Sequence, residues 1–285
     1  FSSSRILMDL ITLIIALSLY QVVRPGSLLQ RDDWLYRADE RLSAVLDNSL
    51  LRAGALLLLI LLLLGWTLAE LEGWWFGLVP ITVAVAMLVW ALGHDDYHTE
   101  LERQLAAKED NPTATETTNS SATGQQKSSL WMREEDTFAP DAAALSREHN
   151  SLNRRVLYAG YARWFPPVLY FLLFGPAMAV GYRAVSLLAA KEADRSETVY
   201  NNILFYFDWL PVRAVAATCA LVGDFTAVFR ANVGELLLST KGAPEILEIV
   251  ANASVDQVNL KTQSELLYRC SGLWLLLIVL ILVLS

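Results

Sequence analysis

Long uncharged stretches of apolar residues divide this chain into segments. Residues 53–69 and 74–93 each lack charged side chains, and only the short sequence Glu70-Leu71-Glu72-Gly73 separates them. A helix of about 20 apolar residues matches the thickness of the hydrocarbon core of a bilayer. The pattern therefore predicts a membrane hairpin, in which two spanning helices are joined by an acidic turn.

Further apolar runs predict additional membrane helices at residues 6–23, 164–182, 203–222 and 270–285. The first resembles a signal peptide in length, but no small-residue cleavage site follows it, so we interpret it as a retained first helix. The prediction of this first helix does not depend on residues 1–7. The run at 203–222 contains charged side chains and either spans the membrane or re-enters it, so the sequence predicts about four to six spans.

Polar side chains prevail between these runs. Residues 27–52 combine charged and apolar positions at helical spacing, which predicts an amphipathic helix on the membrane surface. Residues 94–163 form a long polar loop, whose low-complexity part at 109–129 is expected to be disordered. Helical spacing returns at 141–163, and residues 224–269 are polar with a helical pattern.

These segments predict an all-α fold, namely a polytopic helical membrane protein with amphipathic cytoplasmic helices. Residues 1–93 hold the N-terminal helix, the amphipathic segment and the hairpin. Residues 94–163 form the cytoplasmic polar loop. Residues 164–285 form a C-terminal membrane domain that includes the polar helical segment at 224–269.

The distribution of Lys and Arg predicts the orientation. Arginines are frequent in residues 24–52 and in the flanks of the 94–163 loop, whereas the hairpin turn has none. Cytoplasmic loops of membrane proteins carry an excess of these residues. Residues 24–52 and 94–163 are therefore expected in the cytoplasm, with Glu70 and Glu72 outside. The side of residues 224–269 stays open, because it depends on whether residues 203–222 span.

Composition supports the membrane interpretation. The chain is 54% hydrophobic and 18% charged, with a net charge of -8, whereas soluble domains average about 25% charged residues. The negative charge argues against a nucleic-acid partner, which would require a basic face. The two cysteines, Cys219 and Cys270, lie in or beside apolar stretches and are interpreted as small buried thiols rather than as a disulfide or a metal site.

The most informative polar residues are ionisable groups within apolar runs. Arg183, Asp208 and Arg213 lie where a charge costs at least ~2.5 kcal/mol on insertion scales, so each is expected to face protein or water and to have a partner. Asp208 and Arg213 lie about 140° apart on an ideal helix. We therefore expect Asp208 to pair with Arg183 across helices, and Arg213 to reach Asp224 or a lipid phosphate.

Two further residues complete this candidate membrane-embedded polar site. Tyr182 directly precedes Arg183, and Pro211 lies between the two charges of the later run. Proline lacks an N–H group, so Pro211 leaves the carbonyl of Phe207 without its helical donor and favours a bend. The alternative is that these charges only lock helices together or extend to the membrane interface.

The sequence predicts no catalytic residue, metal or cofactor. His94 and His98 share a helix face with Asp95 near them, but two ligands are too few for zinc, and a polar cap after a membrane helix is the simpler interpretation. The chain contains neither a Gly-x-Ser-x-Gly nucleophile motif nor a Gly-x-x-x-x-Gly-Lys phosphate loop.

Three blocks of the chain resemble the AmpE family. They are Arg163-Trp-Phe-Pro-Pro-Val-Leu-Tyr-Phe-Leu-Leu-Phe-Gly-Pro-Ala-Met-Ala-Val-Gly-Tyr-Arg183, Phe207-Asp-Trp-Leu-Pro-Val-Arg213 and Ala220-Leu-Val-Gly-Asp224. The resemblance implies a multi-pass protein of the bacterial inner membrane. It also implies a non-enzymatic accessory or sensory role in the regulation of β-lactamase induction or the cell-wall stress response. The implied partners are the lipid bilayer, a cytoplasmic or membrane protein, and a ligand derived from the cell wall.

The AmpE family is in turn similar to the CobD/CbiB cobalamin-pathway synthases, which use ATP. Where those enzymes carry an acidic motif, this chain reads Leu157-Tyr-Ala-Gly-Tyr-Ala-Arg163. Phe207-Asp208 stands for their acidic pair, and Pro211-Val-Arg213 for their Pro-Ala-Arg. The alternative function is a divergent CobD/CbiB-like synthase, or a binder of a nucleotide or amphiphilic ligand around Arg183, Asp208 and Arg213. A transporter of wall fragments ranks below both, because only residues 164–182 resemble a broken helix.

Overall fold

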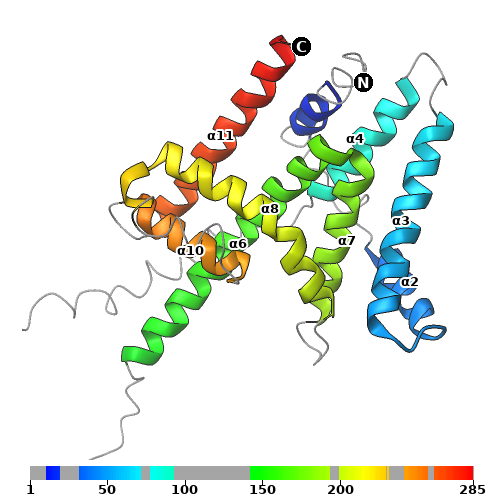
Figure 1. The fold of residues 1–285 in the computed structure, drawn as a ribbon, viewed down its shortest axis with the longest axis horizontal. Helices are drawn as coiled ribbons and strands as arrows, with labels where there is room; N and C mark the ends of the chain where they lie inside the picture. Colours follow the sequence, from blue (N-terminus) through cyan, green and yellow to red (C-terminus); the bar gives the residue numbers. More distant parts are fainter. Residues whose placement is uncertain are drawn as a thin grey trace, which may run out of the picture. The chain divides into compact units, whose positions relative to one another are not determined.

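A computed structural model confirms the all-α fold class (Figure 1). It describes residues 11–19, 32–71, 78–92, 142–192, 199–228, 230, 241–255 and 260–284, and no strand occurs among them. Residues 1–95 and 157–285 make one compact unit, and residues 96–156 make a second. The predictions for 109–129 and for His94 and His98 lie outside the described residues. Of the predicted hairpin turn, residues 70 and 71 still belong to a helix, and residues 72 and 73 lie outside the described part.

Eight helices with defined bounds make up most of this described part, and residues 11–19 are also helical. The bounds are α2 Asp33–Ser43, α3 Ser49–Leu71, α4 Leu78–Leu92, α6 Ala142–Phe174, α7 Pro176–Glu192, α8 Val199–Val222, α10 Ala243–Ser254 and α11 Leu260–Leu284. Helix α6 runs across the predicted domain boundary between residues 163 and 164. The predicted amphipathic segment at 27–52 is likewise divided, because α2 ends at Ser43 and α3 begins at Ser49.

Three described helices are long and apolar enough to cross a membrane: Ser49–Leu71, Val199–Val222 and Lys261–Ile281. They correspond to the predicted runs at 53–69, 203–222 and 270–285. The last span begins earlier than the sequence predicted, because α11 starts at Leu260 and continues without a break into the apolar run. The second arm of the predicted hairpin is the shorter apolar helix Val79–Leu92, which packs against α3.

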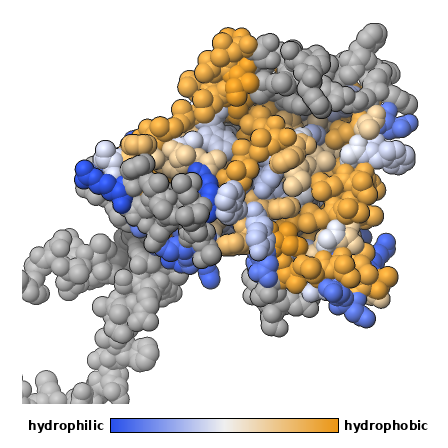
Figure 2. Space-filling view, viewed as in Figure 1, coloured by the Kyte–Doolittle hydropathy of each residue, from blue (hydrophilic) through white to orange (hydrophobic). Residues whose placement is uncertain are grey.

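Large apolar side chains face outward along two of these helices. Figure 2 shows hydrophobic surface spread over the described part of the molecule. On α3 the exposed side chains lie along most of the helix, and on α11 they gather in its second half. They are Leu58, Leu59, Leu62, Leu63 and Trp66 on α3, and Leu276, Leu277, Val279, Leu280 and Ile281 on α11. A protein in water would not expose so large an apolar area, so lipid is the expected solvent of these faces.

The run at 164–182, which the sequence indicated to be a broken helix, is divided between two helices. Helix α6 ends at Phe174 and α7 begins at Pro176, while Pro166 and Pro167 are accommodated inside α6. The break is at Gly175, whose φ of 87° is a left-handed conformation that favours glycine. Figure 1 shows the chain changing direction there. This turn places α7 beside α8.

Two clusters of buried apolar side chains hold the helices together. The larger cluster draws on α6, α8, α10 and α11, with Phe165 and Trp274 in edge-to-face contact at 5.3 Å between ring centroids. The smaller cluster joins α2, α3 and α7 around the fully buried Leu35. Part of the apolar face of α2 therefore packs against protein, while its position on the membrane surface stays a prediction.

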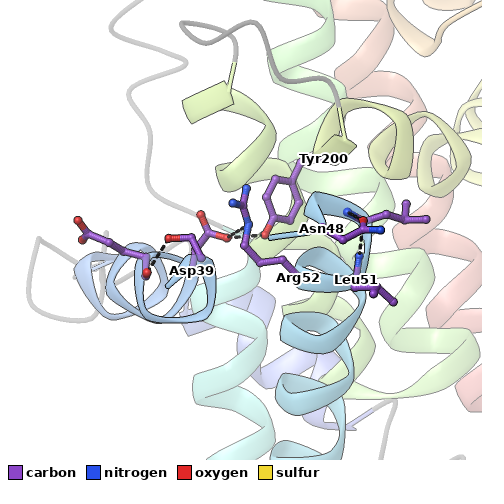
Figure 3. Close-up of polar contacts among 8 residues, drawn as sticks. Asp39, Asn48, Leu51, Arg52 and Tyr200 are labelled. Carbon is purple, nitrogen blue, oxygen red and sulfur yellow. Dashed lines mark hydrogen bonds and ion pairs between the residues drawn. The ribbon is translucent and has the colours of Figure 1, made fainter. Parts of the chain in front are cut away.

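Polar contacts fix α2 to its neighbours (Figure 3). The Tyr200 hydroxyl donates a hydrogen bond of 2.7 Å to the carboxylate of Asp39, and Arg52 Nε lies 3.3 Å from the same carboxylate oxygen. The side-chain oxygen of Asn48 accepts hydrogen bonds from the backbone N–H groups of Leu50 and Leu51 at the start of α3. Residues of α2, α3 and α8 thus meet at one partly buried ion pair.

Candidate functional site

Asp208 is the centre of the candidate site. It lies in the middle of α8 and is only 3% exposed. Three tyrosine hydroxyls donate hydrogen bonds to its carboxylate: Tyr158 at 2.6 Å, Tyr182 at 2.8 Å and Tyr161 at 3.3 Å. We call these four residues the Asp208–tyrosine cluster. It connects α6, α7 and α8 through a single carboxyl group.

The local sequence explains how the three donors converge. Tyr158 and Tyr161 are three residues apart on α6, so they share one helix face. Their rings lie 5.8 Å apart between centroids. Tyr182 comes from α7, which the turn at Gly175 brings against α8. The tyrosine bodies pack in the apolar interior, while each buried hydroxyl requires a hydrogen-bond partner.

Pro211 leaves a backbone group directly beside Asp208 without its helical partner. The carbonyl of Phe207 lacks its helical donor, because the residue four positions later is a proline. The Tyr170 hydroxyl donates a hydrogen bond of 2.6 Å to this carbonyl. The Tyr170 ring also stacks on that of Tyr182 at 5.8 Å between centroids. The proline in α8 is thus compensated by a side chain from α6.

The arrangement suits the holding of a negative charge away from water. Hydrogen bonds to an ionised group are stronger than neutral ones, at about 1.5–3 kcal/mol each. The carboxylate oxygens of Asp208 face hydroxyl donors, a geometry that positions helices rather than presenting a nucleophile. A relative shift of α6, α7 or α8 would lengthen at least one of these bonds. The cluster is therefore sensitive to how the three helices pack.

The remaining predicted site residues lie around this cluster. Arg183 follows Tyr182 along α7, but the described hydrogen bonds to Asp208 come from tyrosines, and the pairing of Arg183 with Asp208 stays a prediction. Arg213 donates from Nη1 to the carbonyl of Trp209 at 2.8 Å, and its guanidinium lies 4.2 Å from the centroid of the Trp209 ring.

Asp224, the other predicted partner of Arg213, caps the short helical turn that follows it. Its carboxylate accepts hydrogen bonds from the Thr226 hydroxyl at 2.6 Å and from the backbone N–H groups of Thr226 and Ala227. These bonds, led by that of the Thr226 hydroxyl, hold the pKa of Asp224 below its ordinary value. Asp224 therefore acts locally, as the N-cap of the helical turn that follows α8.

Sequence reasoning identified Asp208, Pro211 and Tyr182 but missed the donors from α6. Tyr158 and Tyr161 belong to the block in which the sequence comparison noted the loss of an acidic motif. The available signal was the spacing of the two tyrosines, which places both hydroxyls on one face of a predicted helix. A buried tyrosine hydroxyl needs a partner, and Asp208 was the nearest unexplained charge in the apolar runs.

We expect Tyr170→Phe to destabilise the folded protein by about 1–3 kcal/mol, because the Phe207 carbonyl would stay buried without a donor. In a Pro211→Ala background the same change should cost clearly less, because the backbone N–H of residue 211 then supplies the donor. A double-mutant cycle measured by unfolding in detergent tests this coupling. Tyr206→Phe, at a hydroxyl-bearing ring on α8 that is 73% exposed, is the matched control and should change little. Equal losses in both backgrounds would contradict the assignment.

Comparison with known proteins identifies one family. The family model described as regulatory signalling modulator protein AmpE matches residues 8–257. This match covers every residue of the Asp208–tyrosine cluster, together with Tyr170, Pro211 and Arg213. Searches of curated proteins and of solved structures gave no match.

Proposed function

Because the chain belongs to the AmpE family of regulatory signalling modulator proteins, we propose that it is a non-enzymatic sensory or accessory protein of the bacterial inner membrane. In this proposal it regulates β-lactamase induction or the cell-wall stress response. Its partners are the bilayer, a cytoplasmic or membrane protein, and a ligand derived from the cell wall. A regulatory role in signalling follows from the family itself. The antibiotic response, the inner membrane and the absence of catalysis are the proposed parts.

The observation that carries the proposal is the Asp208–tyrosine cluster. A signalling protein needs an element whose packing responds to a ligand or a partner. The carboxylate of Asp208 ties α6, α7 and α8 together by hydrogen bonds of defined length. Binding that moves one of these helices would break or lengthen hydrogen bonds to the buried carboxyl group. The free-energy cost would favour one packing of α6, α7 and α8 over another. Arg183, beside Tyr182, and Arg213 extend the candidate site along α7 and α8.

The test uses a Gram-negative host with an inducible β-lactamase and a deletion of its own family member. We expect wild-type chain to restore the induced β-lactamase activity, and Tyr158→Phe to alter it while leaving the amount of protein in the membrane unchanged. Tyr206→Phe should behave as wild type. Unchanged induction in the deletion strain would overturn the proposal. If purified protein were instead stabilised against heat by ATP, the divergent synthase or nucleotide binder would be favoured.

A further inference from the structure

The two cysteines of the chain meet in the interior. Cys219 lies near the end of α8 and Cys270 in the first half of α11. Their sulfur atoms are 3.4 Å apart, and the residues are 2% and 0% exposed. Both are free thiols in this structure. The fold therefore brings together two reactive groups that are 51 positions apart in the sequence.

We propose that Cys219 and Cys270 form a redox modification site, which a lipid-soluble quinone converts to an intramolecular disulfide. A disulfide requires sulfur atoms about 2.05 Å apart. From the observed 3.4 Å the sulfurs must approach by about 1.4 Å, which is within the range of small side-chain rotations. The reaction breaks two S–H bonds and forms one S–S bond. The two electrons and two protons pass to the quinone, which leaves as the quinol.

The position of the pair favours an oxidant from the membrane. Both cysteines belong to helices that are long and apolar enough to cross a bilayer, Val199–Val222 and Lys261–Ile281. Because both thiols are buried, an oxidant reaches them only when α8 and α11 separate briefly. Within the bilayer a small lipid-soluble quinone is positioned to enter then, whereas water-soluble disulfides stay outside the membrane. Metal binding is a weaker interpretation, because within the described ranges no group of three or more His, Cys, Asp or Glu side chains could hold a metal ion.

The cross-link would act on the layer formed by α8, α10 and α11. Helix α10 packs against both α8 and α11. Cys219 lies eleven residues, about three helical turns, after Asp208 on the same helix. Oxidation would fix the C-terminal half of α8 to α11 and restrict movement of the helix that carries the Asp208–tyrosine cluster. This consequence rests on the proposed function, whereas formation of the disulfide does not.

The test treats the full chain, reconstituted in lipid vesicles, with a short-chain quinone. The protein is then unfolded without reductant and exposed to a maleimide. We expect alkylation to fall about tenfold, the intact mass to decrease by two hydrogens, and dithiothreitol to restore both. Closing a loop of this size is also expected to raise the unfolding temperature by about 5–10 °C. Cys219→Ser and Cys270→Ser should each keep one alkylatable thiol and show no shift.

Three results would overturn the proposal. They are full alkylation after quinone treatment, a covalent quinone adduct in place of the mass loss, and disulfides found only between two chains. Each is distinguishable from failure of the proposed function, because the measurement involves no β-lactamase. If the disulfide also affects the proposed regulatory function, the induction of β-lactamase should be altered in a strain that carries Cys219→Ser.

Discussion

Replacing Asp208 with alanine is expected to lower the free energy of unfolding by about 3–5 kcal/mol, the largest effect of any single change at the site. The substitution leaves the hydroxyls of Tyr158, Tyr161 and Tyr182 buried without the acceptor that they share. Asp208→Asn should be milder, because the amide oxygen still accepts hydrogen bonds. Unfolding in mixed micelles followed by circular dichroism measures these differences.

A compensating variant separates the charge from the packing around it. Removing a buried polar group and its partners together is often close to neutral. Asp208→Leu combined with phenylalanine at the three tyrosine positions should therefore be more stable than Asp208→Leu alone. Asp47→Ala, at an exposed carboxylate, is the control and should stay within about 0.5 kcal/mol of wild type. An Asp208→Ala protein as stable as this control would show that the cluster contributes nothing to the fold.

Gly223→Ala is expected to destabilise the protein by about 2–3 kcal/mol, because α8 and α10 approach too closely for a methyl group. A Cβ atom at Gly223 would lie 2.7 Å from the backbone oxygen of Ser254, 2.8 Å from its Cβ and 3.0 Å from the backbone oxygen of Cys219. Backbone atoms cannot move aside as the end of a flexible side chain can. The two helices must separate to make room.

Matched glycine variants test the same point. A Cβ at Gly54 or Gly272 would meet no atom within 4 Å, so alanine there should be neutral or slightly stabilising. Ser254→Gly should not rescue Gly223→Ala, because the nearest obstacle is the backbone oxygen rather than the serine side chain. Thermal unfolding of the set distinguishes these cases. Rescue by Ser254→Gly would show that the side chain, not the backbone, sets the distance between α8 and α10.

The pattern of apolar residues predicted the location of the described candidate spans, because helix length and composition must match the bilayer wherever a helix crosses it. The ends of the helices were less well predicted. The prolines and the glycine of residues 164–182 indicated a broken helix, but not which of them breaks it. The break lies at Gly175, whereas Pro166 and Pro167 are accommodated within α6. Similarly, α11 begins within polar sequence, because a helix continues as long as its backbone bonds are satisfied.

The all-α class, the apolar helices, the burial of Asp208 and the carbonyl left without a donor by Pro211 could all be predicted from the sequence. They follow from hydropathy and from the missing N–H of proline. Which side chains donate to Asp208 and to the Phe207 carbonyl depends on how the helices pack together. Three tyrosine hydroxyls converge on Asp208, and the Tyr170 hydroxyl reaches the carbonyl of Phe207. The meeting of Cys219 and Cys270 was decided in the same way. The partner of a buried polar group depends on which faces of different helices pack together. The spacing of residues along one helix does not show which other helix packs against it.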